Sequence, residues 1–233
     1  MEIKIENVTK KIRSARVVDS VSMELSSGRV YGLKGINGSG KTMLMRLISG
    51  LIYPTEGQIT IDGKVLGKDM HFPESIGLLI ENPAFLDAYS GYDNLKLLAS
   101  IREKAGEKQI REILKRVGLD PDSRKKYRKY SLGMKQRLGI AGAVLEEPDL
   151  LILDEPTNAL DSDGVEMLKS LVQDERERGA LVIVSCHDGK ILEEMADEIY
   201  FLENGRVVSV ENSRGVVVED EKGTSAESGE GSI

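Results

Sequence analysis

A glycine-rich segment early in the chain has the residue types and spacing of a phosphate-binding loop. It reads Gly35-Ile36-Asn37-Gly38-Ser39-Gly40-Lys41-Thr42 and fits the pattern G-x-x-x-x-G-K-[ST]. Glycines there let backbone N–H groups turn toward phosphate oxygens, and the N-terminus of a following helix adds partial positive charge. We expect Lys41 to reach the β- and γ-phosphates and the Thr42 hydroxyl to join the coordination of Mg²⁺. The predicted nucleotide-binding residues are Gly35, Asn37, Gly38, Ser39, Gly40, Lys41, Thr42 and Met43.

Two carboxylates follow a later apolar run. Residues 150–153 are apolar at every position, as a strand covered on both faces requires, and Asp154 and Glu155 come directly after them. A carboxylate at the end of a parallel strand beside a phosphate loop is where a magnesium-linked aspartate is needed. We therefore predict Asp154 as a second metal ligand beside Thr42, and Glu155 as the residue that polarises the attacking water.

Other nucleotide-binding classes fit these residues less well. A dinucleotide-binding loop would carry a third glycine where Met43 stands. The chain also lacks the Asn-Lys-x-Asp motif that reads guanine. ATP is therefore the expected ligand, together with Mg²⁺.

The surrounding pattern predicts an α/β fold that positions these residues. A short apolar strand over 30–33 leads into the glycine-rich loop, and a helix over 43–49 follows it. Alternating apolar residues predict an antiparallel lobe before the main sheet, and helical periodicity predicts an inserted helical subdomain at about 86–145. Asp163 with Glu166 predicts a capping box that starts a helix running to Arg178. A second buried strand over 181–184 and a hairpin over 199–210 complete a parallel-sheet core.

The composition argues against a membrane-spanning or nucleic-acid-binding protein and indicates a reducing compartment. No apolar run approaches the ~18 residues that cross a bilayer, and the single cysteine, Cys186, suits a reducing compartment. A net charge of −7 with 4% aromatic residues argues against a nucleic-acid partner. We expect one domain over 1–210 and an acidic tail over 211–233, with a composition typical of disorder from about residue 220.

Three further segments give the chain a resemblance to a known family. Residues 130–137 read Tyr-Ser-Leu-Gly-Met-Lys-Gln-Arg and resemble the signature helix of ATP-binding cassette (ABC) proteins. Residues 156–161 are similar to the D-loop of that family, and Ser185-Cys186-His187 is similar to its H-loop. With the glycine-rich loop as Walker A and 150–155 as Walker B, five elements stand in family order. The resemblance implies a P-loop ABC cassette with a RecA-like core.

The same resemblance implies a partner for every subunit. In the family two subunits face head to tail, as a homodimer or as a heterodimer with a related ATPase. Ser131 and Gly133 would contact the γ-phosphate held by the other subunit, and Asp161 would link the two sites. A separate transmembrane permease subunit would be driven by this pair, which places the chain in the cytoplasm on the inner face of the cell membrane.

Within one subunit, the resemblance implies a role in ATP hydrolysis for each of a few side chains. Lys41 would hold the β- and γ-phosphates, and His187 would contact the γ-phosphate. Thr42 and Asp154 would position Mg²⁺, and Glu155 would orient or deprotonate the attacking water. Lys41, Glu155 and His187 are therefore expected catalytic residues.

Three departures from the family pattern mark a subfamily. Ile12 stands where most relatives carry an aromatic residue that stacks on adenine, and Leu132 replaces the first glycine of the signature. Glu81 stands where the family has the Q-loop glutamine, and we expect it to be a catalytic residue and a metal ligand. Glutamate there, with this signature, resembles the bacitracin- and lantibiotic-type export and immunity ATPases of bacteria.

We therefore expect an ATPase subunit that powers export of, or immunity to, a peptide antibiotic or another amphipathic compound. The three departures favour one alternative, a nucleotide-binding regulatory module with weak or no turnover. A DNA-repair or translation ABC protein fits poorly, because the former needs a long coiled coil between the Walker motifs and the latter typically carries two cassettes.

Overall fold

The computed structural model describes residues 1–212 together with 217 and 218. The disorder expected from about residue 220 lies outside these described residues. Within them, no helix combines the length and the apolar character that a membrane crossing requires.

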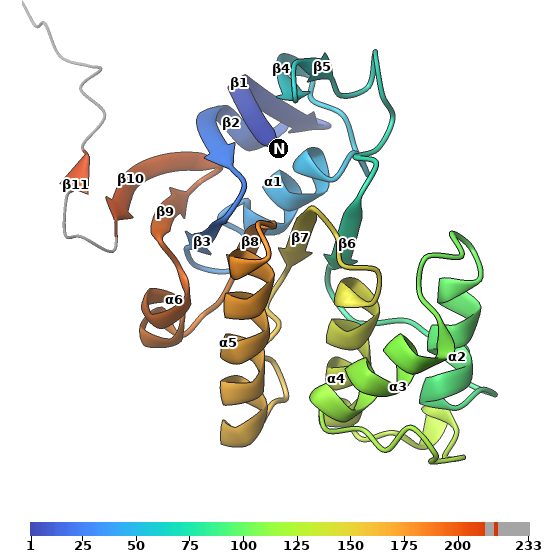
Figure 1. The fold of residues 1–233 in the computed structure, drawn as a ribbon. Helices are drawn as coiled ribbons and strands as arrows, with labels where there is room; N and C mark the ends of the chain where they lie inside the picture. The colour runs from blue at the N-terminus through green and yellow to red at the C-terminus, as the bar shows by residue number, and fades with distance from the viewer. Residues whose placement is uncertain (213–216, 219–233) are drawn as a thin grey trace, which may run out of the picture.

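Four strands form the expected antiparallel lobe at the N-terminal end. The sheet order is β2-β1-β4-β5, with bounds β1 Glu2–Ile12, β2 Ala15–Ser26, β4 Glu56–Ile61 and β5 Lys64–Val65. Ile3 and Ile5 face inward with exposures of 0% and 2%, while their neighbours along β1 are more exposed, so the alternation of side chains defines the buried face. Figure 1 shows this lobe at one end of the molecule, next to α1 (Lys41–Ile48).

The second sheet is the core that carries the site. Its order is β11-β10-β9-β3-β8-β7-β6. The five strands from β9 to β6 run parallel to one another, and β10 is antiparallel to both β9 and β11. Their bounds are β3 Arg29–Lys34, β6 Ile76–Leu79, β7 Leu150–Leu153, β8 Leu181–Ser185, β9 Glu198–Glu203, β10 Arg206–Asn212 and β11 Val217–Val218. Every residue of β7 and β8 is buried, because helices and the N-terminal lobe cover both faces of a parallel sheet.

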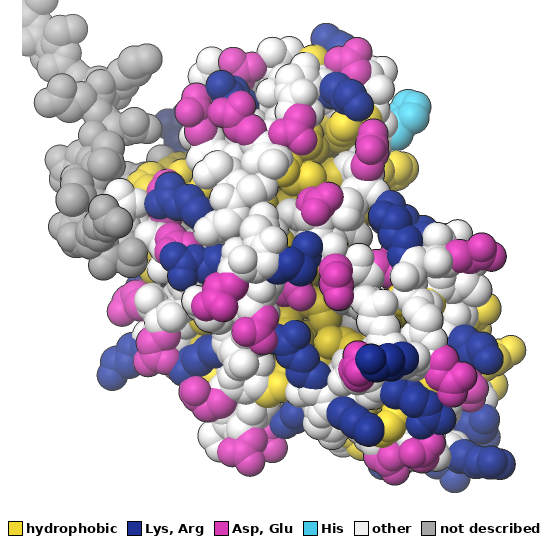
Figure 2. Space-filling view, in the orientation of Figure 1, with side chains coloured by type: hydrophobic (Ala, Val, Ile, Leu, Met, Phe, Trp, Pro, Cys, Tyr) yellow, Lys and Arg dark blue, Asp and Glu magenta, His cyan; other side chains and the backbone are white. Residues whose placement is uncertain are grey.

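Helices inserted between β6 and β7 form a separate group, as predicted. They are α2 Gly91–Ala99, α3 Glu107–Arg116, the 3₁₀ turn Tyr127–Lys129 and α4 Leu132–Val144. Ser90 accepts a hydrogen bond from the Asp93 backbone N–H, and this capping box begins α2. Figure 1 shows the three α-helices together beyond β6, and Figure 2 shows many basic side chains over this part of the visible face.

The remaining helices pack on the core sheet, and one starts differently from the sequence prediction. They are α5 Ser162–Glu177 and α6 Gly189–Met195. The expected capping box of Asp163 and Glu166 is wrong, because Asp161 is the N-cap and its carboxylate accepts from the Gly164 backbone N–H at 3.0 Å. Asp163 lies in the first turn instead, where a negative charge is favourable to the helix dipole.

Candidate nucleotide-hydrolysis site

The glycine-rich loop lies between the end of β3 and the start of α1, where its close backbone contacts require glycine. Gly40 has a φ of +108°, and a Cβ there would lie 2.8 Å from the Val17 carbonyl oxygen. A Cβ at Gly35 would lie 2.4 Å from the Leu202 carbonyl oxygen. The first backbone N–H groups of α1 have no partner within the helix, so the loop presents donors and partial positive charge to an anion. The buried Ser39 hydroxyl also has no hydrogen-bond partner among the described residues.

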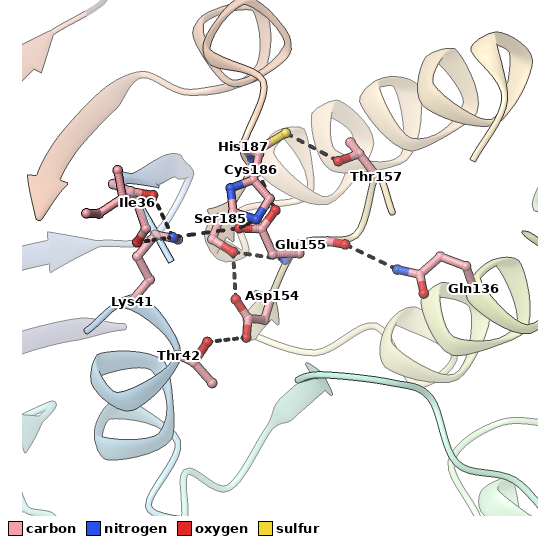
Figure 3. A network of polar contacts seen from close by, with 11 residues as sticks. Ile36, Lys41, Thr42, Gln136, Asp154, Glu155, Thr157, Ser185, Cys186 and His187 are labelled. Carbon is pink, nitrogen blue, oxygen red and sulfur yellow. Dashed lines mark hydrogen bonds and ion pairs between the residues drawn. The ribbon is translucent and has the colours of Figure 1, made fainter. Parts of the chain in front are cut away.

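Lys41 is folded back across this loop. Its side chain is 6% exposed, and its ammonium donates to the carbonyl oxygens of Gly35 at 2.7 Å and Ile36 at 3.3 Å. The same ammonium lies 3.8 Å from a carboxylate oxygen of Glu155. Figure 3 draws this contact as a dashed line. A buried cation is thus held between the phosphate loop and the end of β7, where it is placed to meet a phosphate.

Thr42 and Asp154 meet at the same point, and their oxygens fit a magnesium ion. The Thr42 hydroxyl donates to one Asp154 carboxylate oxygen at 2.7 Å, and the Ser185 hydroxyl donates to the other at 2.7 Å. Among the described residues there is no group of three or more acidic, histidine or cysteine side chains that would hold a metal alone. This is the pattern for Mg²⁺, which takes one or two protein oxygens and completes its shell with phosphates and water.

Glu155 follows Asp154 with its backbone in the left-handed region, at a φ of +48°. Its backbone N–H donates to Ser185 at 2.9 Å, and its carboxylate accepts from the His187 backbone N–H at 3.1 Å. The His187 Nε2 atom lies 3.3 Å from the other carboxylate oxygen. Burial raises the pKa of Glu155, and the nearby His187 and Lys41 only partly offset this effect. A carboxylate with a raised pKa is a stronger base for a water proton.

A comparison of the chain with protein-family models identifies its family. Residues 18–158 match the model described as ABC transporter. The chain belongs to the ABC transporter family. The expected ATPase, in which ATP hydrolysis is coupled to transport, and the expected cassette fold are thereby confirmed.

Curated relatives resemble this ABC ATPase over most of its length. An uncharacterised ABC transporter ATP-binding protein of Bacillus subtilis, YybJ, is 46% identical over 205 residues, covering 88% of this chain and 94% of YybJ. The bacitracin transport ATP-binding protein BcrA of Enterococcus faecalis is 38% identical over 208 residues, covering 88% and 68%. The lantibiotic transport ATP-binding protein SrtF of Streptococcus pyogenes is 35% identical over 207 residues, covering 88% and 89%. The expected resemblance to bacitracin- and lantibiotic-type ATPases is confirmed.

A solved structure shows the same cassette fold. The dimeric, post-hydrolysis structure of the ATP-binding cassette MJ0796 with ADP and Pi superposes with a TM-score of 0.79 at 26% identity. The superposition covers 92% of this chain and 100% of the MJ0796 chain.

The predicted signature residues lie at the beginning of α4. Ser131 is the N-cap of that helix and accepts a hydrogen bond from the Met134 backbone N–H at 3.2 Å. Leu132 is 73% exposed, and a Cβ at Gly133 would lie 2.8 Å from the Ala159 carbonyl oxygen. In Figure 1 the inserted helices stand across β6 and β7 from α1. The exposed start of α4 is therefore free to face a second subunit.

Asp161 is held within its own subunit by two contacts. Besides capping α5, its carboxylate lies 2.7 Å from the guanidinium of Arg137 on α4. The Gly164 backbone N–H and Arg137 hold the pKa of Asp161 below its usual value. Asp161 is therefore fixed in its own subunit, and its expected role in linking the two ATP sites of a dimer stays a prediction.

Glu81 and Ile12 are further predicted site residues that do not belong to the network of Figure 3. Glu81 follows β6, and its carboxylate pairs with Arg46 at 2.6 Å. The structure does not bring Glu81 into contact with Thr42 or Asp154 in the described hydrogen bonds, and its catalytic and metal roles stay a prediction. Ile12 ends β1 opposite Ala15 and is 42% exposed, so its side chain is available to a base.

The sequence predicted no individual role for three residues that organise the site, although Ser185 and Gln136 stand in the H-loop and signature segments. Ser185 joins Asp154 to Glu155, although its position at the end of a buried strand beside His187 was a usable signal. Gln136 donates to the carbonyl oxygens of Glu155 and Pro156 at 3.4 and 3.0 Å, and so ties α4 to the end of β7. Arg46 lies 35 residues from its partner Glu81 along the chain, and no local sequence pattern predicts such a pair.

Proposed function

We propose that this chain is the ATP-hydrolysing motor of an exporter for a peptide antibiotic or another amphipathic compound, acting on a separate membrane subunit. The observation that carries the proposal is the contact of Glu155 with both His187 and Lys41, beside the paired Thr42 and Asp154. A module that only binds nucleotide has no need to hold a buried carboxylate at this position. The names of BcrA and SrtF support the class of cargo.

In this proposal the chain's own residues bind the triphosphate and activate water. The loop amides and Lys41 hold the β- and γ-phosphates, with Lys41 exchanging its bonds to loop carbonyls for bonds to phosphate oxygens. Mg²⁺ held by Thr42 and Asp154 would neutralise charge on those oxygens. Glu155 accepts a proton from the attacking water, and His187 orients Glu155 and contacts the γ-phosphate.

The proposed assembly is a head-to-tail pair, formed with a second copy or with a related ATPase. Each ATP would lie between the glycine-rich loop of one subunit and Ser131 and Gly133 of the other. The N-terminus of α4 would then direct its backbone N–H groups at the γ-phosphate. The dimeric form of MJ0796 supports this arrangement.

A groove bordered by β6 and the segment after it is the proposed dock for the membrane subunit. It has a volume of about 380 Å³ and lies between β6, the segment after it, α2 and α4. Its walls combine apolar residues such as Pro83, Phe85 and Ile101 with the charged Arg102 and Glu146. Apolar walls with a few charged groups suit a short amphipathic helix. Docking there would hold the chain against the inner face of the cell membrane, with no part for a nucleic acid.

The test replaces Glu155 by glutamine. Glu155→Gln should bind ATP and lose most turnover, since an amide keeps the shape and cannot accept the proton. It should also accumulate an ATP-bound dimer, detected by size-exclusion chromatography. Glu112→Gln is the control, because Glu112 is an exposed residue paired with Lys108 on α3.

Transport is measured in cells that express the chain with its membrane subunit. Resistance to bacitracin or a lantibiotic should rise with the wild-type chain and fail to rise with Glu155→Gln. Near-normal ATPase activity in Glu155→Gln would refute the role of Glu155. A wild-type chain that binds ATP without turnover would favour the regulatory module instead.

A further inference from the structure

An ion pair joins the phosphate-binding helix to the segment that borders the groove. Arg46 lies in the last turn of α1, the helix that begins with Lys41 and Thr42. Its guanidinium Nη2 atom is 2.6 Å from a carboxylate oxygen of Glu81, the second residue after β6. Residues 80 and 82–85, on either side of Glu81, line the groove described above. The pair therefore spans the distance between the nucleotide site and the proposed dock.

The local geometry makes Glu81 a residue that can be held or released. Its backbone φ is +60°, a region that residues other than glycine rarely adopt, so side-chain contacts must favour it. The side chains of Arg46 and Glu81 are 29% and 61% exposed. Exposed ion pairs are weak, so a stronger cationic partner can take the carboxylate from the arginine.

A glutamate at this position adds a charge that glutamine would not. Without a counter-ion, the carboxylate would repel the phosphates of an incoming nucleotide. The counter-ion that the structure places beside this carboxylate is Arg46. Carboxylate oxygens are also ligands that Mg²⁺ prefers, so a metal bound with nucleotide competes with Arg46 for the same side chain.

We propose that Arg46 is a positioning residue that holds Glu81 in the nucleotide-free subunit and yields it when Mg²⁺ enters with the nucleotide. The exchange changes the contact that fixes the segment after β6, and so reports the nucleotide state to the groove. This inference rests on the proposed approach of Glu81 to the metal. Arg46 itself acts through Glu81 and takes no part in the hydrolysis step.

The experiment measures nucleotide affinity of the full chain with and without metal. The ligand is adenylyl imidodiphosphate, a non-hydrolysable ATP analogue, and its Kd is determined by calorimetry in Mg²⁺ and in excess EDTA. The quantity compared is the ratio of the EDTA Kd to the Mg²⁺ Kd. It is measured for the wild type, Arg46→Gln, Glu81→Gln and the double variant.

The proposal predicts a larger change when Glu81 is present. Losing the charge of Arg46 weakens binding of the metal-free nucleotide in both backgrounds. Only with Glu81 in place does Arg46→Gln also free a carboxylate for the metal. The rise in the Kd ratio should therefore be about two- to five-fold greater in the Glu81 background than in the Glu81→Gln background, the size that an exposed ion pair supports.

Two control variants separate this role from a general charge effect. Arg46→Lys keeps the charge and should keep the Kd ratio near the wild-type value. Arg116→Gln removes an arginine of similar exposure, paired with Asp174 on α5, and should leave the ratio unchanged. If Arg46→Gln unfolds early in a thermal scan, Arg46→Met serves the same comparison.

An equal rise of the ratio in both Glu81 backgrounds would overturn the proposal, because Arg46 would then act only through its own charge. No effect of Glu81→Gln on the ratio in either background would overturn it as well, since Glu81 would not approach the metal. ATP turnover by the same wild-type preparation tests the proposed function separately. A chain without turnover can still show the coupling, and a chain with turnover can lack it.

Discussion

Replacing Ser185 by alanine should destabilise the protein and slow ATP hydrolysis, because this hydroxyl holds both residues at the end of β7. Ser185 is fully buried, and its Oγ atom donates to Asp154 at 2.7 Å while accepting from the Glu155 backbone N–H at 2.9 Å. Alanine removes both bonds and leaves the buried Asp154 carboxylate, 4% exposed, without one of its donors. It also leaves the left-handed backbone at Glu155 without its anchor.

The size of the loss follows from the two bonds. A hydrogen bond to a charged group contributes ~1.5–3 kcal/mol, and a buried N–H left unpaired costs ~1–3 kcal/mol. Allowing for some relaxation, Ser185→Ala should lower the free energy of unfolding by roughly 2–5 kcal/mol. For a domain of this size that corresponds to a fall in Tm of roughly 5–20 °C.

The assay is urea unfolding followed by circular dichroism, with kcat for ATP measured on the same preparations. Ser49→Ala is the matched control, since Ser49 is 1% exposed and donates one bond to the Arg46 carbonyl oxygen at 3.0 Å. Losing that single neutral bond should cost about 1 kcal/mol or less. Equal losses of stability in the two variants, with an unchanged kcat in Ser185→Ala, would refute the reasoning.

Three further predictions concern the base, the nucleobase and the packing of β6. Because burial raises the pKa of Glu155 above its usual 4.5 and the base must be ionised, kcat/KM for ATP should fall as pH decreases through that raised value. An acidic limb centred at or below 4.5 would contradict this. Ile12→Tyr should tighten ATP binding by up to about tenfold, since base–aromatic stacking contributes ~1–3 kcal/mol, and unchanged or weaker calorimetric affinity would contradict the placement of Ile12. Gly77→Ala should cost about 1–3 kcal/mol or more in urea unfolding, because its Cβ would lie 1.9 Å from the Ala143 carbonyl oxygen. Gly106→Ala, with open space around it and a φ of −91°, is the control, and equal stability of the two variants would contradict the clash.

The sequence alone determined the parts of the site that are local. Residues 35–42 are consecutive, and glycine, lysine and threonine at fixed spacing specify the loop wherever the strand and helix lie. Asp154 and His187 were predictable for a related reason, since both follow strands whose apolar residues mark them as buried and parallel. The carboxyl ends of parallel strands share one edge of a sheet, so their side chains meet.

Tertiary structure decided which partner each of these residues has. Asp161, which caps α5, also pairs with Arg137 on α4, 24 positions away along the chain. The bonds from Ser185 to Asp154 and from Arg46 to Glu81 join residues 31 and 35 positions apart. Such contacts have no sequence period, because they arise when strands and helices distant along the chain pack together. The sequence therefore predicts the groups that do the chemistry, and the packing of the strands and helices decides how they are held.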